Sequence, residues 1–206
     1  MAKVKICGLT NFEDAAAAER LGADYLGFVF FSESVRAVTA EGVKPITAGL
    51  EGKARKVGLF YNQGLDFALK TAASCGLDAV QLHGEESQEM VKAFKNAGFT
   101  VIKSFKVGEG FEADVTERYG QADYYLFDTF KKGLPGGTGI AFDWGLIRGA
   151  RFQRPFFLAG GLKPSTVKGA VSALNPYAVD VASGVEERPG KKNVKLMKEF
   201  IDAAKG

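Results

Sequence analysis

A cysteine at the end of the first apolar run is the first residue of this chain that could do chemistry. Val4–Ile6 is a short apolar stretch, and Cys7 follows it directly, before Gly8. Parallel α/β enzymes place their reactive groups at the carboxyl ends of such strands. Most free cysteines are small buried hydrophobes, so Cys7 becomes a reactive candidate only if other functional groups gather around it.

Three further side chains could act with Cys7. Asp128 follows the apolar run Tyr124–Phe127, where burial favours the protonated form that a general acid needs. His83 is the only histidine and could donate a hydrogen bond to a substrate. Arg36 carries a planar fork that suits a substrate carboxylate. The plain alternatives are a helix cap or an ion pair for Asp128 and an ordinary surface position for Arg36.

Two glycine-containing segments late in the chain predict a phosphate site. Bare backbone N–H groups at the end of a strand can approach an oxyanion closely, although glycines also serve in simple tight turns. A third glycine-rich segment, 136–139, could close over the same anion. The candidate phosphate-binding residues are Gly160 and Gly161, Ser183 and Gly184, and Gly137 and Thr138.

Short apolar runs alternate with amphipathic stretches along the whole chain. The runs are continuously apolar, which is typical of strands buried on both faces, and their alternation with helices predicts parallel pairing. The expected strands are Val4–Ile6, Tyr25–Phe30, Lys56–Phe60, Ala79–Leu82, Val101–Phe105, Tyr124–Phe127, Phe156–Ala159 and Ala178–Val181.

The helices between these strands are predicted from their periodicity and end signals. Thr10 is the expected N-cap of the first helix, because Glu13 stands at capping-box spacing from it. Phe111–Tyr119 shows no clean apolar stripe and is the weakest helix. The other expected helices are Asn11–Leu21, Ala40–Leu50, Leu65–Cys75, Ser87–Asn96, Asp143–Arg148, Thr166–Leu174 and Asn193–Ala203.

About eight strand–helix units favour a single-domain (β/α)8 TIM barrel over residues 1–206. The alternative is an open doubly wound sheet, which has fewer strands and a G-x-G-x-x-G fingerprint after its first strand. Cys7–Thr10 does not carry that fingerprint. In a barrel, the candidate side chains would meet at the carboxyl ends of the strands, with phosphate held by the loops after strands seven and eight.

Composition narrows the class of function. With 46% hydrophobic and 25% charged residues, the chain is an ordinary globular protein, and its net charge of +3 is too small to indicate nucleic-acid binding. We expect no membrane span, because no apolar run approaches about 20 residues. One histidine and two cysteines outside CxxC spacing predict no metal site. The absence of a signal peptide predicts a cytoplasmic protein with reduced thiols.

The chain resembles the phosphoribosylanthranilate isomerase family of tryptophan biosynthesis over essentially its whole length. Seven segments match in family order, and one departure is Val35, where the family often has proline. The matching segments are Lys5–Thr10, Gly27–Phe30 with Ser34–Arg36, Val80–Glu85, Leu126–Thr129, Gly136–Gly139 with Phe142–Trp144, Leu158–Leu162 and Val179–Glu186.

The resemblance implies a cofactor-free barrel that isomerises a phosphorylated amino sugar by an Amadori rearrangement. By the resemblance, Cys7 is the general base, Asp128 the general acid and Arg36 the contact for the anthranilate carboxylate, while the loop glycines hold the phosphate. A thiolate base requires a lowered thiol pKa, for which the helix start after Gly8 and the cation of Lys5 are candidate causes.

Two other functions stay open at this point. A Schiff-base aldolase would need a lysine inside the barrel, for which Lys103 in the fifth strand is the candidate. A non-catalytic phosphosugar-binding barrel would need neither Cys7 nor Asp128. A metal-dependent epimerase is disfavoured by the lone His83. The sequence leaves the oligomeric state open, a homodimer included.

Overall fold

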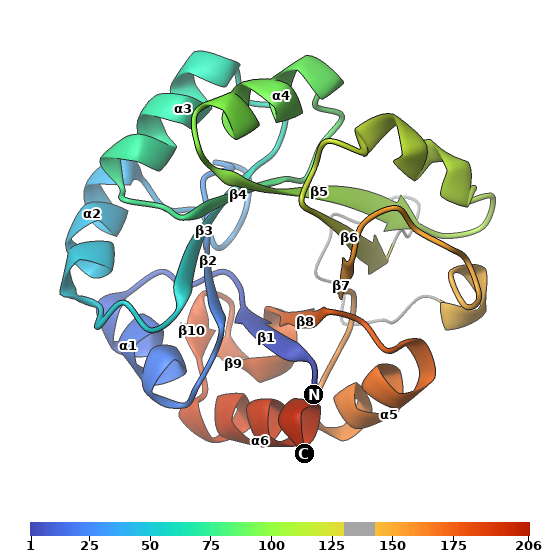
Figure 1. The fold of residues 1–206 in the computed structure, drawn as a ribbon. Coiled ribbons are helices and arrows are strands. Elements are labelled where there is room, and N and C mark those ends of the chain that lie inside the picture. The colour runs from blue at the N-terminus through green and yellow to red at the C-terminus, as the bar shows by residue number, and fades with distance from the viewer. Residues whose placement is uncertain (130–142) are drawn as a thin grey trace.

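The computed structural model describes residues 1–129 and 143–206, and its centre is a closed barrel of eight parallel strands in sequential order (Figure 1). The strands are β1 (Lys3–Ile6), β2 (Tyr25–Val29), β3 (Arg55–Phe60), β4 (Ala79–Leu82), β5 (Thr100–Val107), β6 (Tyr124–Thr129), β7 (Phe156–Leu158) and β8 (Ala178–Val181). The predicted barrel is therefore confirmed.

Closure of the sheet brings the first and last strands together. Lys5 of β1 lies level with Tyr25 on β2 and with Asp180 on β8. Because β1 has a partner on each side, the barrel leaves no unpaired edge there.

The helices form the outer ring around the strands (Figure 1). They are α1 (Phe12–Arg20), α2 (Ala40–Gly49), α3 (Leu65–Ser74), α4 (Gln88–Asn96), α5 (Pro164–Leu174) and α6 (Val194–Lys205), with the 3₁₀ turns η1 (Ala113–Tyr119), η2 (Trp144–Leu146) and η3 (Ser183–Val185). A short antiparallel hairpin, β9 (Glu186–Arg188) with β10 (Lys191–Lys192), precedes α6. None of the helices in the described parts of the chain is long and apolar enough to cross a membrane.

The predicted start of the first helix is wrong by one residue. Asn11 is the N-cap, because its side chain accepts the Asp14 N–H at 2.9 Å. The Thr10 hydroxyl instead donates to the Gly190 carbonyl at 2.6 Å, which ties the loop after β1 to the β9–β10 hairpin. Thr10 therefore serves tertiary structure and not helix capping.

Two predicted helices are 3₁₀ turns in the structure. Only Trp144–Leu146 of the expected helix 143–148 is helical, and Gly149 takes a positive φ of 83° just beyond it. Glycine has a low helix propensity, so a glycine this close to the end of the turn disfavours its extension into a longer helix. Ala113–Tyr119 lacks the apolar stripe that would stabilise an α-helix by packing. The glycine-rich segment 136–139 lies outside the described residues.

Side chains alternate between two packed layers along each strand. One cluster fills the barrel interior, and a larger one packs between the barrel and the helices. The interior cluster consists of Tyr25, Val57, Ala79, Ile102, Leu126, Phe157, Ala159 and Ala178. Gln81 on β4 and Asp180 on β8 each stand two residues after an interior residue, Ala79 or Ala178. Because side chains alternate along a strand, both also point into the barrel, beneath the candidate residues.

Candidate active site at the carboxyl ends of the strands

The structure places the candidate residues of the described chain at one end of the barrel. Cys7 follows β1, His83 follows β4, and Asp128 stands next to the end of β6. The glycine pair Gly160 and Gly161 follows β7, and η3 begins at Ser183 after β8. Gly137 and Thr138 lie outside the described residues.

Cys7 is held in a narrow space between β1 and β2. Its side chain is buried, and its backbone N–H donates to the Val181 carbonyl at 2.8 Å. A Cβ atom on Gly27 would lie 2.8 Å from the Cys7 sulfur and 3.2 Å from Lys5 Cε. Gly27 is therefore needed for the thiol to occupy this place, and the Lys5 side chain runs close to the sulfur.

A buried ion pair lies beneath the thiol. Lys5 Nζ is 3.0 Å from Asp180 Oδ1, and the Lys5 side chain has no exposed surface. Burial raises the pKa of the Cys7 thiol, while the positive charges of Lys5 and Lys192 act in the opposite direction. The lowered thiol pKa expected from the sequence is thus not what the structure indicates, because desolvation outweighs the neighbouring cations.

A second buried lysine supports the backbone of Cys7. Lys192 Nζ donates to the Cys7 carbonyl and to the Ala182 carbonyl, and it lies 2.9 Å from Glu186 Oε1. Burial lowers the pKa of Lys192, and the Glu186 charge opposes that shift. Sequence reasoning missed this residue, because a lysine in a polar hairpin carries no local signal of burial.

Arg36 lies over Gly8 and is already engaged with a carboxylate. Its Nε and Nη2 each donate to Glu186 at 2.7 Å in a bidentate pair. A Cβ atom on Gly8, whose φ is +71°, would stand 2.5 Å from Arg36 Cδ. Gly8 thus lets the arginine reach the mouth of the barrel beside Cys7, and Glu186 fixes the orientation of its fork.

His83 and Asp128 approach each other across the barrel mouth. His83 Nε2 lies 3.5 Å from Asp128 Oδ2, and both side chains are less than one-fifth exposed. On its other side, His83 Nδ1 lies 2.8 Å from Gln81 Nε2 and 3.0 Å from Ser104 Oγ. Sequence reasoning did not find Gln81 or Ser104, since both stand inside predicted strands.

The glycines after β7 and β8 are needed for packing as well as for backbone exposure. Gly160 and Gly161 take positive φ values of 85° and 64°. A Cβ atom on Gly160 would lie 2.1 Å from Thr129 Oγ1, and one on Gly184 would lie 2.0 Å from the Leu162 carbonyl oxygen. A side chain at Gly160 or Gly184 would therefore disturb the loops whether or not they bind phosphate.

Lys103 does not occupy the position that a Schiff-base mechanism requires. Its side chain is 3% exposed and lies 3.0 Å from Glu86 Oε2, and it also donates to the Gly84 carbonyl at 2.6 Å. Burial lowers the pKa of Lys103, with Glu86 acting against the shift. Lys103 alternates with the interior residue Ile102, so it faces the helix layer and clamps the loop after β4.

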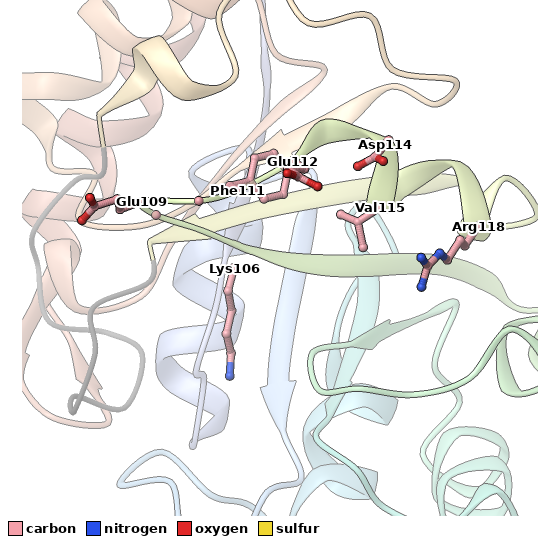
Figure 2. A pocket seen from close by; sticks show the side chains of 9 residues that line it. Lys106, Glu109, Phe111, Glu112, Asp114, Val115 and Arg118 are labelled. Carbon is pink, nitrogen blue, oxygen red and sulfur yellow. The ribbon is translucent and has the colours of Figure 1, made fainter.

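Neither a metal centre nor a second reactive cluster emerges from the described residues. No group of three or more His, Cys, Asp or Glu side chains there could hold a metal ion. A cavity of about 380 Å³ runs along the loop after β5, but none of the candidate residues lines it. Figure 2 shows its charged side chains, among them Lys106, Glu109 and Arg118, pointing in different directions and not toward one centre.

Known proteins resemble the chain along its full length. The family described as N-(5'phosphoribosyl)anthranilate (PRA) isomerase matches residues 4–203. The isomerase of Rubrobacter xylanophilus is 43% identical over 205 residues, and that of Geobacter sulfurreducens is 45% identical over 206 residues. Each alignment covers 100% of both chains.

Solved structures agree with the sequence relatives. The phosphoribosylanthranilate isomerase of Thermotoga maritima superposes with a TM-score of 0.93 at 40% identity, with 100% of both chains covered. An isomerase in complex with reduced 1-(o-carboxyphenylamino)-1-deoxyribulose 5-phosphate superposes with a TM-score of 0.88 at 39% identity, again over 100% of both chains. The resemblance inferred from the seven sequence segments is confirmed: the chain belongs to the phosphoribosylanthranilate isomerase family.

Proposed function

We propose that Cys7 and Asp128 carry out the family's reaction on this barrel. That reaction is the isomerisation of N-(5'-phosphoribosyl)anthranilate to 1-(o-carboxyphenylamino)-1-deoxyribulose 5-phosphate, a step of tryptophan biosynthesis. The observation that carries the assignment of roles is the pairing of one thiol with one carboxyl at the same barrel mouth. Cys7 follows β1 and Asp128 stands on β6, with β7 and β8 between these two strands. We place the sugar between the two side chains.

The chemistry needs one acid and one base on the sugar. Asp128 donates its proton to the furanose ring oxygen, and the bond between that oxygen and C1 breaks to leave an iminium ion. The iminium acidifies the hydrogen on C2, which the Cys7 thiolate removes. The resulting enolamine tautomerises to the ketone. One proton enters from Asp128 and one leaves to Cys7, so the step is balanced and needs no redox partner.

The remaining candidates would bind the two anionic ends of the substrate. Glu186 uses the Nε and Nη2 edge of Arg36, so the Nη1 group is the one we assign to the anthranilate carboxylate. The phosphate is assigned to the backbone N–H groups of the loops after β7 and β8. These are Gly160, Gly161, Ser183 and Gly184, with Gly137 and Thr138 as the candidates from the segment after β6.

Kinetics of two variants test the role assignment. Phosphoribosylanthranilate is generated in place, and its consumption is followed by loss of fluorescence. Cys7→Ala and Asp128→Asn should each lower kcat by at least about 100-fold, the scale of a general acid or base. Cys75→Ala is the matched control, because Cys75 is an equally buried thiol that lies 3.6 Å from the Ala40 carbonyl in the helix layer.

Near-parental turnover in Cys7→Ala or Asp128→Asn would overturn the roles. A purely binding barrel would bind the phosphorylated product analogue and show no turnover even in the parent. We also propose a homodimer, supported by a solved structure of monomers that were generated from the dimeric isomerase of Thermotoga maritima. Light scattering at the monomer mass would contradict it. The cytoplasmic location stays a prediction.

A further inference from the structure

The side chain of His83 is held between the candidate acid and two polar groups from neighbouring strands. Nε2 lies 3.5 Å from Asp128 Oδ2, while Nδ1 lies 2.8 Å from the Gln81 amide and 3.0 Å from the Ser104 hydroxyl. Both nitrogens of the ring are thus directed at protein groups. This arrangement fits a histidine that serves Asp128 better than one that serves the substrate.

The partners of Nδ1 decide which hydrogen bond Nε2 can make. With the Gln81 NH₂ group directed at Nδ1, that nitrogen accepts, and a neutral His83 carries its hydrogen on Nε2. The Nε2–H group then faces an ionised Asp128 across the 3.5 Å separation. This arrangement corresponds to the state in which Asp128 has already given up its proton.

The Gln81 amide carries an unsatisfied atom that permits the opposite arrangement. Gln81 is 1% exposed, and its Oε1 has no hydrogen-bond partner in the described residues. Rotation of the amide by half a turn would direct Oε1 at Nδ1, which then donates. Nε2 is left free to share the proton of a protonated Asp128, and the Ser104 hydroxyl can follow because it both donates and accepts.

We propose that His83 is a positioning residue that holds a proton jointly with Asp128 and so keeps the acid loaded, with Gln81 and Ser104 adjusting to either protonation state. The proposal rests on the proposed role of Asp128 as the general acid. His83 would act on the rate through Asp128 and not on substrate affinity.

Two lysines of β5 stand near the pair in the described part of the chain. On β5, Lys106 lies level with Asp128, and its Nζ donates to the Tyr61 hydroxyl at 3.2 Å. Lys103 faces the helix layer and pairs with Glu86 at 3.0 Å. Of these two lysines, Lys106 is the one that lies level with Asp128, and it is present in the parent and in the His83 variants alike.

Two substitutions of His83 separate its roles. Asn is too short to reach Asp128, whereas Gln carries its amide about where Nε2 lies. We expect His83→Asn to lower kcat at pH 8 at least about tenfold and to change KM less than about threefold. The ratio of its rate to the parent rate should vary with pH, because only in the parent does Asp128 share its proton with an imidazole. His83→Gln should recover part of the loss in kcat.

A double-variant cycle with Asp128→Asn closes the test. If His83 acts through the acid, His83→Asn adds less than about twofold to the loss caused by Asp128→Asn alone. Additive losses, a raised KM with unchanged kcat, or a rate ratio that does not vary with pH would overturn the proposal. If Asp128→Asn itself turns over at the parental rate, the proposed acid role fails first, and that result is visible without any His83 variant.

Discussion

Replacing Lys5 by methionine tests whether the buried ion pair sustains the thiolate. The two side chains have similar length, so the substitution removes the charge and keeps most of the packing. Lys5 is fully buried 3.0 Å from Asp180, and removal of one partner leaves a buried charge uncompensated. We expect the free energy of unfolding to fall by about 3–5 kcal/mol. Chemical denaturation with urea measures it.

The same substitution should make the thiol less reactive. A Cβ on Gly27 would lie within 3.2 Å of both Lys5 Cε and the Cys7 sulfur, so the ammonium and a thiolate are close neighbours. Opposite charges roughly 5 Å apart at an effective dielectric constant of about 20 attract by about 3 kcal/mol. Loss of Lys5 therefore raises the pKa of Cys7 further, in the direction that burial has already set. Alkylation at pH 8 should slow at least about tenfold.

The partner substitution should have the opposite sign. The negative charge of Asp180 raises the pKa of Cys7, so Asp180→Asn should speed alkylation, although it also destabilises the fold. Lys5→Met combined with Asp180→Asn should recover most of the stability, because no buried charge is left alone. Its alkylation rate should lie between those of Lys5→Met and the parent. Lys5 thus supports the thiolate and Asp180 opposes it, and the effect of Lys5 is the larger of the two.

The assay is the rate of Cys7 modification by iodoacetamide from pH 7 to 10, read by mass spectrometry in a Cys75→Ala background. The parent rate should keep rising with pH beyond the range of an ordinary thiol, because burial raises the pKa of Cys7. Equal rates in the parent, Lys5→Met and Asp180→Asn would refute the electrostatic reasoning.

Other residues give shorter tests. Arg36→Lys should raise KM at least about tenfold with a smaller change in kcat, because one ammonium cannot hold Glu186 and a substrate carboxylate together; steady-state kinetics decide it. Gly184→Ala should lower the free energy of unfolding by at least about 2 kcal/mol, since its Cβ would meet backbone at 2.0 Å. Gly169→Ala, with open space in helix α5, should be neutral or stabilising in the same urea experiment. The pKa of Glu186 is lowered by Arg36 and Lys192 against burial, so Glu186→Gln should weaken the fold at pH 7 by about 1–3 kcal/mol and flatten the loss of stability as the pH falls below about 4.

Most of the barrel could be predicted because its strands correspond to continuous apolar runs in the sequence. Two strands, Ala79–Leu82 and Ala178–Val181, have the predicted bounds, and the other strands differ by one or two residues at an end. The hairpin of β9 and β10 was not predicted, because strands of two or three polar residues carry no periodicity. Both η1 and η2 were predicted as longer α-helices. The segment of η1 lacks the apolar stripe that would stabilise an α-helix, and glycine disfavours an extension of η2.

Candidate site residues could be selected from the sequence only where a reactive side chain follows a strand. Cys7 and Asp128 were selected in that way, and their catalytic roles stay a proposal. Asp180 was not predicted as a site residue. It stands inside an apolar run and contacts Lys5 only because β8 pairs with β1 in the closed barrel. Lys192 was missed because its contact with the Cys7 carbonyl joins segments that lie far apart in the chain. Gln81 was missed because it stands inside a predicted strand.

The rate of a single turnover tests the central claim most directly. With enzyme in excess over phosphoribosylanthranilate, this rate reports the chemical steps without product release. We expect Cys7→Ala to lose at least about 100-fold in that rate while binding reduced 1-(o-carboxyphenylamino)-1-deoxyribulose 5-phosphate with a Kd within about threefold of the parent value. A Cys7→Ala variant that binds the analogue and converts the substrate at the parental rate would contradict the assignment of Cys7 as the base.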